Sequence, residues 1–240
     1  MSDRLLSVEA LDAGYDDVAV VRGLDLYVEA GEVVALLGPN GAGKTTTLMT
    51  ISGMVQRLKG SVSILGNQVP RLRQAHRVRR WGVLHVPENR GILFQLTVRE
   101  NLELAKTTGK VDISLALEFF PALEPLMNRR GGLLSGGEQQ MLALGRAIAA
   151  EPKLLMVDEM SLGLAPTIYE DLMPVVRRVA DETGAGVLLV EQHVDLALEV
   201  ADRGYVLNHG DLAMHGTAAD LLADRHLLDA SYLGVEVLDE

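Results

Sequence analysis

The segment with the clearest chemistry is a glycine-rich loop that follows an apolar run and precedes a helical pattern. Residues 38–45 read GPNGAGKT, which fits G-x-x-x-x-G-K-S/T. Glycines let backbone N–H groups wrap around phosphate oxygens, and the N-terminus of the following helix adds partial positive charge. Lys44 can reach the β- and γ-phosphates, and the Thr45 hydroxyl can bind Mg²⁺. We therefore expect a nucleotide site formed by Gly38, Pro39, Asn40, Gly41, Ala42, Gly43, Lys44, Thr45 and Thr46.

A second apolar run ends in two adjacent carboxylates. Residues 154–157 read LLMV and are followed by Asp158 and Glu159. Ligands of open α/β sheets bind at the carboxyl ends of the strands, and adjacent residues of a strand point to opposite sides. The two acids therefore need not share a role. We expect Asp158 to bind Mg²⁺ and Glu159 to act as the base that polarises an attacking water. A solvated strand end is the plain alternative, which the intact phosphate loop makes less favourable.

A third motif, LSGGEQQ at residues 134–140, opens a predicted helix. Ser135 can cap that helix, and Glu138 stands three residues later, which is the spacing of a capping box. Gly136 and Gly137 leave backbone N–H groups open to an anion. The alternative interpretation is an ordinary capped helix. Residues 97–100 (TVRE) have the same capping-box spacing.

The elements that must position these motifs alternate between strands and helices. Strands are expected at residues 5–10, 18–28, 32–37, 61–65, 83–86, 154–157 and 187–190. Helices are expected at 43–53, 72–80, most of 97–150, between the last two strands, and at 218–230, with a hairpin turn at 208–211. This order implies an α/β fold with a mostly parallel sheet and helices on both faces. The stretch of helices interrupts the alternation, so we expect one domain over 1–240, with a core of 1–88 and 151–240 and an inserted helical subdomain at about 89–150.

Composition limits the possible partners. The 240 residues carry a net charge of −11, which disfavours binding to nucleic acid because affinity for phosphates comes mostly from Lys and Arg. Cysteine is absent, so neither disulfides nor thiolate metal sites can form. The first 15 residues do not resemble a secretory signal, and no apolar run approaches about 18 residues. We expect any contact with a membrane to be made from its surface, through a partner.

Together these motifs resemble the ATPases of ABC transporters, because LSGGEQQ stands between the two nucleotide motifs as it does in that family. The resemblance implies a P-loop NTPase (RecA-like) core, an N-terminal antiparallel β subdomain and an inserted α-helical subdomain. It implies that two subunits enclose two ATP molecules head to tail. The contact with the partner subunit's ATP would come from Ser135, Gly136, Gly137 and Glu138. Tyr15 would stack on adenine, and residues 161–166 (SLGLAP) would form a loop between subunits.

The resemblance can be narrowed. Residues 86–102, 134–149, 161–166, 189–207 and 231–234 resemble the shorter of the two ATPases of branched-chain amino acid importers. This implies ATP and Mg²⁺ as cofactors and a peripheral location on the cytoplasmic face of the membrane. The implied partners are a second ATPase subunit (a paralogue, or a second copy in a homodimer), a transmembrane permease and, indirectly, a substrate-binding protein. Alternatives are a cargo such as urea, amides, lipid or polysaccharide, a non-transport ABC protein, and another phosphate-loop enzyme such as a GTPase or kinase.

Two positions depart from the general ABC pattern. Glu88 stands where the family has a glutamine that approaches Mg²⁺ and the attacking water, in a loop that contacts the membrane domain. It could bind Mg²⁺ or pair with Arg90. Gln192 stands where the family has a histidine that touches the γ-phosphate, and His193 follows it. A shift of one residue turns a side chain away. We therefore expect Gln192 to be the catalytic side chain there, with His193 as the alternative.

Two smaller features complete the comparison with the family pattern. Met160 replaces a proline that usually follows the catalytic glutamate, and we expect only a small change in backbone freedom there. Residues 71–80 (RLRQAHRVRR) are strongly basic. Their plain interpretation is a solvated helix face, and the sharper one is contact with an acidic partner or with lipid head groups.

Overall fold

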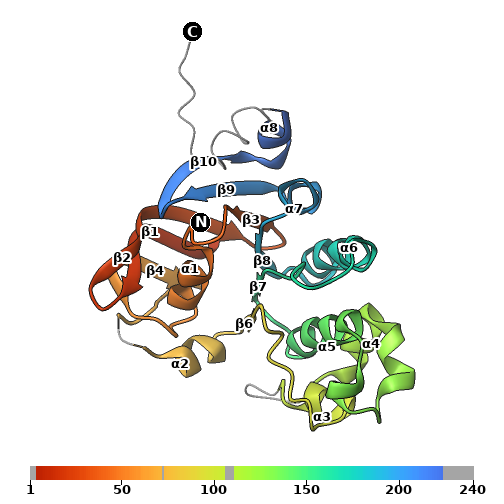
Figure 1. Ribbon diagram of the computed structural model, residues 1–240. Helices are drawn as coiled ribbons and strands as arrows, with labels where there is room; N and C mark the ends of the chain where they lie inside the picture. The colour runs from red at the N-terminus through yellow and green to blue at the C-terminus, as the bar shows by residue number, and fades with distance from the viewer. Residues whose placement is uncertain (1–3, 72, 106–110, 224–240) are drawn as a thin grey trace.

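The computed structural model describes residues 4–71, 73–105 and 111–223, in which two β-sheets form (Figure 1). The first sheet is antiparallel, with the strand order β2-β1-β4-β5. Its strands are β1 (Arg4–Tyr15), β2 (Val18–Glu29), β4 (Arg57–Ile64) and β5 (Asn67–Gln68). The second sheet has the order β10-β9-β3-β8-β7-β6, and only the β9–β10 pair is antiparallel. Its strands are β3 (Val33–Leu37), β6 (Val83–Val86), β7 (Leu154–Asp158), β8 (Gly186–Glu191), β9 (Arg203–Asn208) and β10 (Asp211–Thr217).

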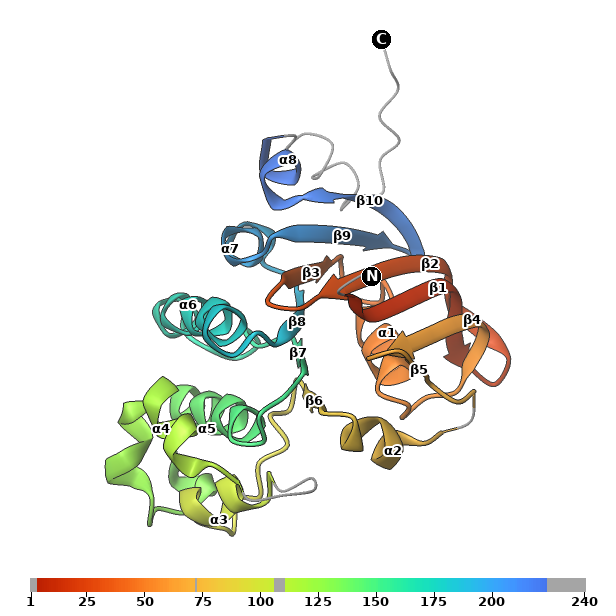
Figure 2. The ribbon, with the colours of Figure 1, turned by 180° about the vertical axis from the view of Figure 1, so that it is seen from behind.

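The parallel strands are buried on both faces, which explains why they read as continuous apolar runs. Alternate residues of β3 belong to different cores. Val34 and Leu36 pack with α1 (Lys44–Ile51) and the antiparallel sheet, whereas Val33, Ala35 and Leu37 pack on the side of the helices α5 to α7. Figure 2 shows the same layers from behind, with α5, α6 and α7 on one side of the central sheet and α1 with the antiparallel sheet on the other.

The remaining helices lie beside the central sheet or in the helical region beyond β6. They are α2 (Ala75–Arg80), α3 (Val98–Glu103), α4 (Ile113–Phe119), α5 (Gly136–Ile148), α6 (Pro166–Thr183), α7 (Val194–Val200) and α8 (Ala218–Ala223), with 3₁₀ turns at Pro121–Leu126 and Gly131–Leu133. Helices α3, α4 and α5 gather at one end of the molecule, beyond β6 (Figure 1). None of the helices in the described part of the chain has both the length and the apolar character to cross a bilayer.

Several expected elements differ in extent. The first strand continues past Ala10 to Tyr15, with Ala10 at φ 44° and its N–H donated to the Asp25 carboxylate. The helix expected at 72–80 begins only at Ala75. The stretch at 97–150 is broken into short helices, because Pro121 and Pro125 cannot continue a regular α-helix. The last helix is described only to Ala223, so the rest of the expected 218–230 segment and the SYLG motif at 231–234 lie outside the described residues.

Both predicted capping boxes are confirmed. In α3 the Thr97 side chain accepts the Glu100 N–H while the Glu100 carboxylate accepts the Thr97 N–H, and Ser135 and Glu138 do the same for α5. Because Ser135 caps α5, the residues that the resemblance assigns to a partner's ATP stand at a helix start with a defined backbone geometry.

Candidate nucleotide site

The phosphate loop joins β3 to α1 and depends on glycine at two close approaches. A Cβ at Gly38 (φ 150°) would lie 2.3 Å from the carbonyl oxygen of Leu207, and one at Gly43 (φ 101°) would lie 2.4 Å from Cγ2 of Val21. Neither position has room for a side chain. The loop therefore follows β9 and β2 closely and brings its backbone over the N-terminus of α1.

Lys44 lies at the centre of this loop and is only 3% exposed. Its Nζ donates hydrogen bonds to the carbonyl oxygens of Gly38 (2.8 Å) and Pro39 (3.1 Å), and lies 3.2 Å from Oε1 of Glu159. A buried ammonium in such a loop is a strong attractor for phosphate, because desolvation removes the water that would otherwise screen it. In the described structure this cation is balanced by the carboxylate of Glu159.

The oxygen donors expected at the metal are Thr45, in the first turn of α1, and Asp158, at the carboxyl end of β7. Thr45 Oγ1 donates to Asp158 Oδ1 across 3.2 Å. Burial raises the pKa of Asp158 to about 6, with Glu159 and Glu88 adding to the rise, although the Thr45 hydrogen bond opposes it. A bound divalent cation would favour the ionised form of this buried carboxyl group. Mg²⁺ takes few protein ligands and keeps waters and phosphate oxygens, so the oxygens of Thr45 and Asp158 suit it.

Glu159 is held in place by a second contact. Its Oε2 accepts a hydrogen bond from Gln192 Nε2 at 2.6 Å, so the end of β8 and the end of β7 meet at this carboxylate. His193 takes a different direction. It precedes α7, and its ring lies 5.8 Å from that of Tyr169 on α6. The shift of one residue thus separates the two side chains, as the alternation of an extended chain requires.

These residues line a cavity of about 310 Å³. The predicted residues on its wall are Asn40, Gly41, Gly43, Lys44, Thr45, Thr46, Glu88, Glu159 and Gln192. Val20 of β2 and Leu162 line it as well. Val20 was missed, since an apolar residue within a strand carries no chemical signal. Leu162 was noted only as part of the loop that follows Glu159.

Of the residues predicted to bind this chain's own nucleotide and metal, five do not line the cavity. Gly38, Pro39 and Ala42 shape the loop from behind, and Asp158 reaches the site through Thr45. Tyr15 lies at the end of β1, is 45% exposed, and directs its hydroxyl to Sδ of Met49 at 3.8 Å. An adenine that extends out of the cavity could still meet this exposed ring, so stacking on Tyr15 stays a prediction.

The segment Ser135–Glu138 does not reach the cavity of its own chain. Gly137 is buried against α6, where a Cβ would lie 2.8 Å from Cγ2 of Ile168, while Ser135 is exposed. Because this helix start does not line the cavity of its own chain, the predicted contact of Ser135–Glu138 with a phosphate would be made on another molecule.

Arg90 connects three of these segments. Its guanidinium donates to the side chains of Gln139 (3.2 Å) and Gln140 (3.1 Å) on α5 and to the carbonyl oxygen of Leu162 (3.3 Å). It does not pair with Glu88, and the alternative that these two residues pair is wrong for this structure. Glu88 instead lines the cavity.

A phosphate loop between a parallel strand and a helix, with acids at the carboxyl end of another parallel strand of the same sheet, defines a phosphate-loop nucleoside triphosphatase. The family model described as ABC transporter matches residues 21–161. The chain belongs to the ABC transporter family of ATP-binding proteins, and it binds ATP and hydrolyses it to ADP and phosphate in a reaction coupled to transport.

Its relatives include transport ATPases of more than one kind. The high-affinity branched-chain amino acid transport ATP-binding protein BraG of Pseudomonas aeruginosa is 41% identical over 96% of this chain and 100% of that protein. The lipopolysaccharide export system ATP-binding protein LptB of Escherichia coli K12 is 35% identical over 95% of this chain and 97% of that protein. A solved ATP-binding subunit of an ABC transporter is 30% identical, with a TM-score of 0.81 over 96% and 98% of the two chains.

We expect Gln192→Ala to lower the rate constant of hydrolysis about tenfold while the dissociation constant of ATP changes less than threefold, because one hydrogen bond worth about 1.4 kcal/mol in the transition state is lost. Steady-state kinetics and titration with a fluorescent ATP analogue measure the two quantities. His193→Ala is the matched control, because that ring packs on Tyr169. If His193→Ala slows hydrolysis and Gln192→Ala does not, the roles of the two residues are exchanged.

Proposed function

We propose that this chain is the ATP-hydrolysing subunit of an importer of branched-chain amino acids. It works on the cytoplasmic face of the membrane with a permease, which receives its cargo from a substrate-binding protein. The observation that carries the proposal is the 41% identity to BraG over that protein's whole length, combined with a cavity lined by phosphate-loop residues, Glu159 and Gln192. The division into a core (1–88 and 151–240) and a helical subdomain (about 89–150) belongs to the same proposal.

In the proposed mechanism ATP enters the cavity with its phosphates on the loop amides and Lys44, which exchanges part of its contact with Glu159 for the γ-phosphate. Thr45, Asp158 and Glu88 would hold Mg²⁺, which supplies charge stabilisation to the phosphates. Freed from Lys44 on one oxygen, Glu159 orients a water for attack in line with the leaving group. Catalysis then consists of positioning and electrostatic stabilisation.

Closure of a dimer completes the site. Residues 135–138 of one subunit lie on the γ-phosphate of the other, and the adenine stacks on Tyr15. Hydrolysis removes the charged group that bridges the two subunits, so the dimer reopens. The permease follows this motion and exposes its cargo site to the other side of the membrane.

A second hollow supports the assignment of a permease partner. It has a volume of about 820 Å³ and lies between α2, β6, the loop that contains Glu88, and α5. Most of its lining is apolar, and its charged or ionisable residues are His76, Arg79, His85 and Arg146. Its described walls contain no carboxylate, although the chain as a whole carries 33 acidic residues. Residues 33–87 contain no Asp or Glu at all.

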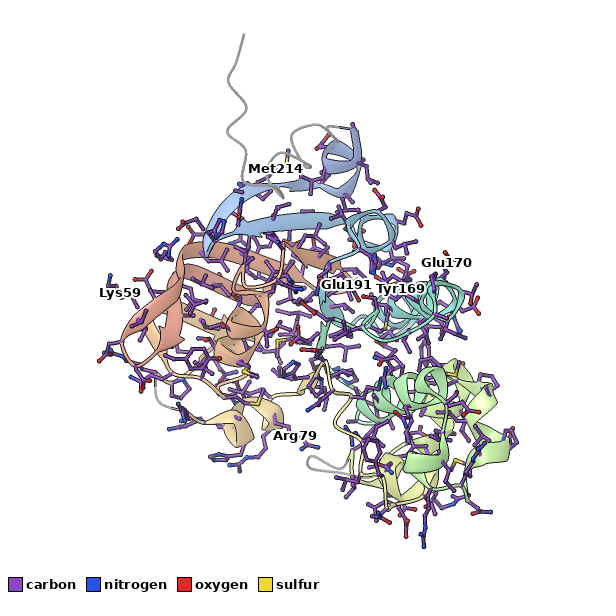
Figure 3. The ribbon with its side chains drawn as sticks, viewed as in Figure 1. Lys59, Arg79, Tyr169, Glu170, Glu191 and Met214 are labelled. Carbon is purple, nitrogen blue, oxygen red and sulfur yellow. The ribbon has the colours of Figure 1, made fainter. Side chains whose placement is uncertain are left out.

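The occupant that fits this hollow is a cytoplasmic helix of the permease with an apolar face and acidic residues. Arg79 of α2 lines the hollow (Figure 3), and its guanidinium donates to the carbonyl oxygen of Leu104 at 3.4 Å. The Nε2 atom of His85 is buried there without a hydrogen-bond partner. An apolar hollow with basic residues favours a helix over lipid head groups, because head groups would leave the apolar lining exposed. His76 and Arg79 of the basic stretch would therefore belong to an interface with an acidic partner.

The test is co-purification from native membranes followed by uptake of labelled leucine into vesicles that contain the recovered complex. We expect a permease in the complex and ATP-dependent uptake. Arg79→Glu should reduce recovery of the permease, whereas Arg99→Glu, the same charge reversal at an exposed residue outside the hollow, should not. Recovery of a lipid exporter, without leucine uptake, would favour the second candidate that the 35% identity to LptB supports. Recovery of no membrane protein would favour a non-transport role.

We also expect a homodimer of this chain to hydrolyse ATP slowly. Gln192 can donate a hydrogen bond but cannot become a cation, so it stabilises the charge of the transition state less than a histidinium would. The proposed working form pairs this chain with a paralogue that carries histidine at this position. The measurement compares the turnover of the purified chain with that of the mixed complex at equal site concentration. Equal turnover would contradict the need for an asymmetric partner.

A further inference from the structure

A fully buried carboxylate next to the catalytic cavity has no part in the mechanism above. Glu191 is the last residue of β8 and is 0% exposed. Burial raises its pKa, and hydrogen bonds from Ser161 and from the backbone N–H of Gln192 act in the opposite direction. A buried acid is costly to keep unless its contacts serve the structure or the reaction. The residues that bind Glu191 indicate which of these two purposes its contacts serve.

Both carboxylate oxygens of Glu191 bind the same residue. Oε1 accepts the backbone N–H of Ser161 at 3.1 Å, and Oε2 accepts the Ser161 hydroxyl at 2.7 Å. Ser161 is two residues beyond Glu159, and Glu191 directly precedes Gln192. One side chain thus ties together the two segments that carry the proposed base and its hydrogen-bond donor.

The segment that Glu191 holds contains a strained residue. Glu159 has φ 44°, in the left-handed region that costs a non-glycine residue about 1–2 kcal/mol. The chain turns sharply there: Glu159 donates its N–H to the carbonyl of Val190 (3.0 Å), and its own carbonyl accepts the N–H of Leu162 (3.2 Å). Strain of this kind persists only where the surroundings hold it. The two hydrogen bonds from Ser161 to Glu191 hold the left-handed conformation of Glu159, because they fix the chain two residues further along the turn.

Further contacts surround Glu191 and the turn that it binds. Tyr169 of α6 lies beside it (Figure 3), and the ring of Tyr169 contacts that of His193. Burial raises the pKa of the Tyr169 hydroxyl, and the Glu191 carboxylate adds to the rise. On the other side of the turn, the carbonyl of Leu162 accepts a hydrogen bond from Arg90. The side chain of Leu162 lines the cavity.

We propose that Glu191 is a positioning residue for ATP hydrolysis, which acts through Ser161. Its carboxylate fixes the turn at residues 159–162 against the end of β8. Glu159 and Gln192 are thereby kept within hydrogen-bonding distance of each other while Lys44 turns to the phosphate. The turn continues into the loop at 161–166. A displacement of that loop would therefore also displace Glu159, the proposed base. This inference rests on the proposed roles of Glu159 and Gln192.

The test measures hydrolysis, ATP affinity and thermal unfolding on the same preparations. We expect Glu191→Gln to lower kcat about tenfold to 100-fold while the dissociation constant of ATP changes less than threefold. The amide keeps the size of the side chain but can accept on only one atom, so one Ser161 donor is lost. Ser161→Ala, which removes the hydroxyl and keeps the backbone N–H, should lower kcat about fivefold, and Ser161→Thr should retain most activity because the hydroxyl remains.

The double variant separates positioning from general destabilisation. If Glu191 acts through Ser161, the loss in Glu191→Gln/Ser161→Ala is smaller than the product of the two single losses. Asn101→Asp is the matched control: this fully buried amide binds Leu93, Leu96 and Thr97 in the helical region, so its exchange should lower the unfolding temperature with kcat unchanged. The proposal would be overturned if the loss in kcat of the double variant equals the product of the two single losses. It would also be overturned if the Glu191→Gln protein is less stable but hydrolyses ATP as fast as the native chain. The readout does not involve cargo, so failure of amino acid import leaves this test intact.

Discussion

Glu159→Gln is expected to abolish turnover almost completely, with kcat reduced about 10³-fold, because a general base contributes about 10²–10⁴ to the rate. The amide has the same shape and can keep the hydrogen bond from Gln192, but it cannot take a proton or hold the charge that now faces Lys44. ATP binding should persist, since the loop amides and Lys44 remain. Unhydrolysed ATP then stays between two subunits, so the variant should elute as a dimer with MgATP in size-exclusion chromatography.

The control for this variant is Glu170→Gln, the same exchange at an exposed residue of α6. It should hydrolyse ATP as the native chain does and show no ATP-dependent dimer peak beyond that of the native chain. A Glu159→Gln protein with native turnover would exclude Glu159 as the base, and Asp158 would then be the next acid to examine.

Lys44→Ala is expected to weaken ATP binding about 100-fold. Hydrogen bonds between charged partners contribute about 1.5–3 kcal/mol each, and the ammonium of Lys44 is 3% exposed, so water screens it poorly. The loss should be larger for ATP than for ADP, because the proposed contacts of Lys44 are with the β- and γ-phosphates and ADP lacks the latter. Isothermal titration with both nucleotides measures the two dissociation constants.

The matched control is Lys59→Ala. Its ammonium pairs with Asp12 at 3.0 Å, but its side chain is 79% exposed, and exposed pairs contribute about 0–1 kcal/mol. We expect its nucleotide affinity to equal that of the native chain. In Lys44→Ala the buried carboxylate of Glu159 loses its cation, so thermal unfolding should be followed as well. Equal affinity for ATP in Lys44→Ala and the native chain, in a folded protein, would contradict the proposed phosphate contact.

Local motifs could be read from the sequence because their chemistry depends on neighbours in the chain. The capping boxes at Thr97 and Ser135 join residues three apart and formed as predicted. Apolar runs such as residues 33–37 and 187–190 lie in buried parallel strands, as their composition required. Element boundaries were less accurate. The expected helix at 72–80 is shorter, and the β1 strand is longer, because pairing with β2 and β4 extends it.

Contacts between distant residues could not be read in this way. Nothing local distinguishes Val20 as a wall of the cavity, or Arg90 as the link between Leu162 and α5 rather than a partner of Glu88. The signal for Glu191 was also weak, since an acid at a strand end is ordinarily solvated. Its burial follows from α6 and the loop after Glu159 closing over the end of β8.

The sequence by itself determined that this protein binds a nucleotide in a phosphate loop, that two acids follow a buried strand, and that Gln192 replaces the usual histidine. Those features are contiguous, so their spacing survives any arrangement of the rest of the chain. Only the tertiary structure decided that Lys44, Glu159 and Gln192 meet, and that the buried Glu191 binds Ser161. Lys44, Glu159 and Gln192 follow the carboxyl ends of β3, β7 and β8, and the order β3-β8-β7 brings those ends to one edge of the sheet. Strand order arises from packing over the whole domain, which no local pattern contains.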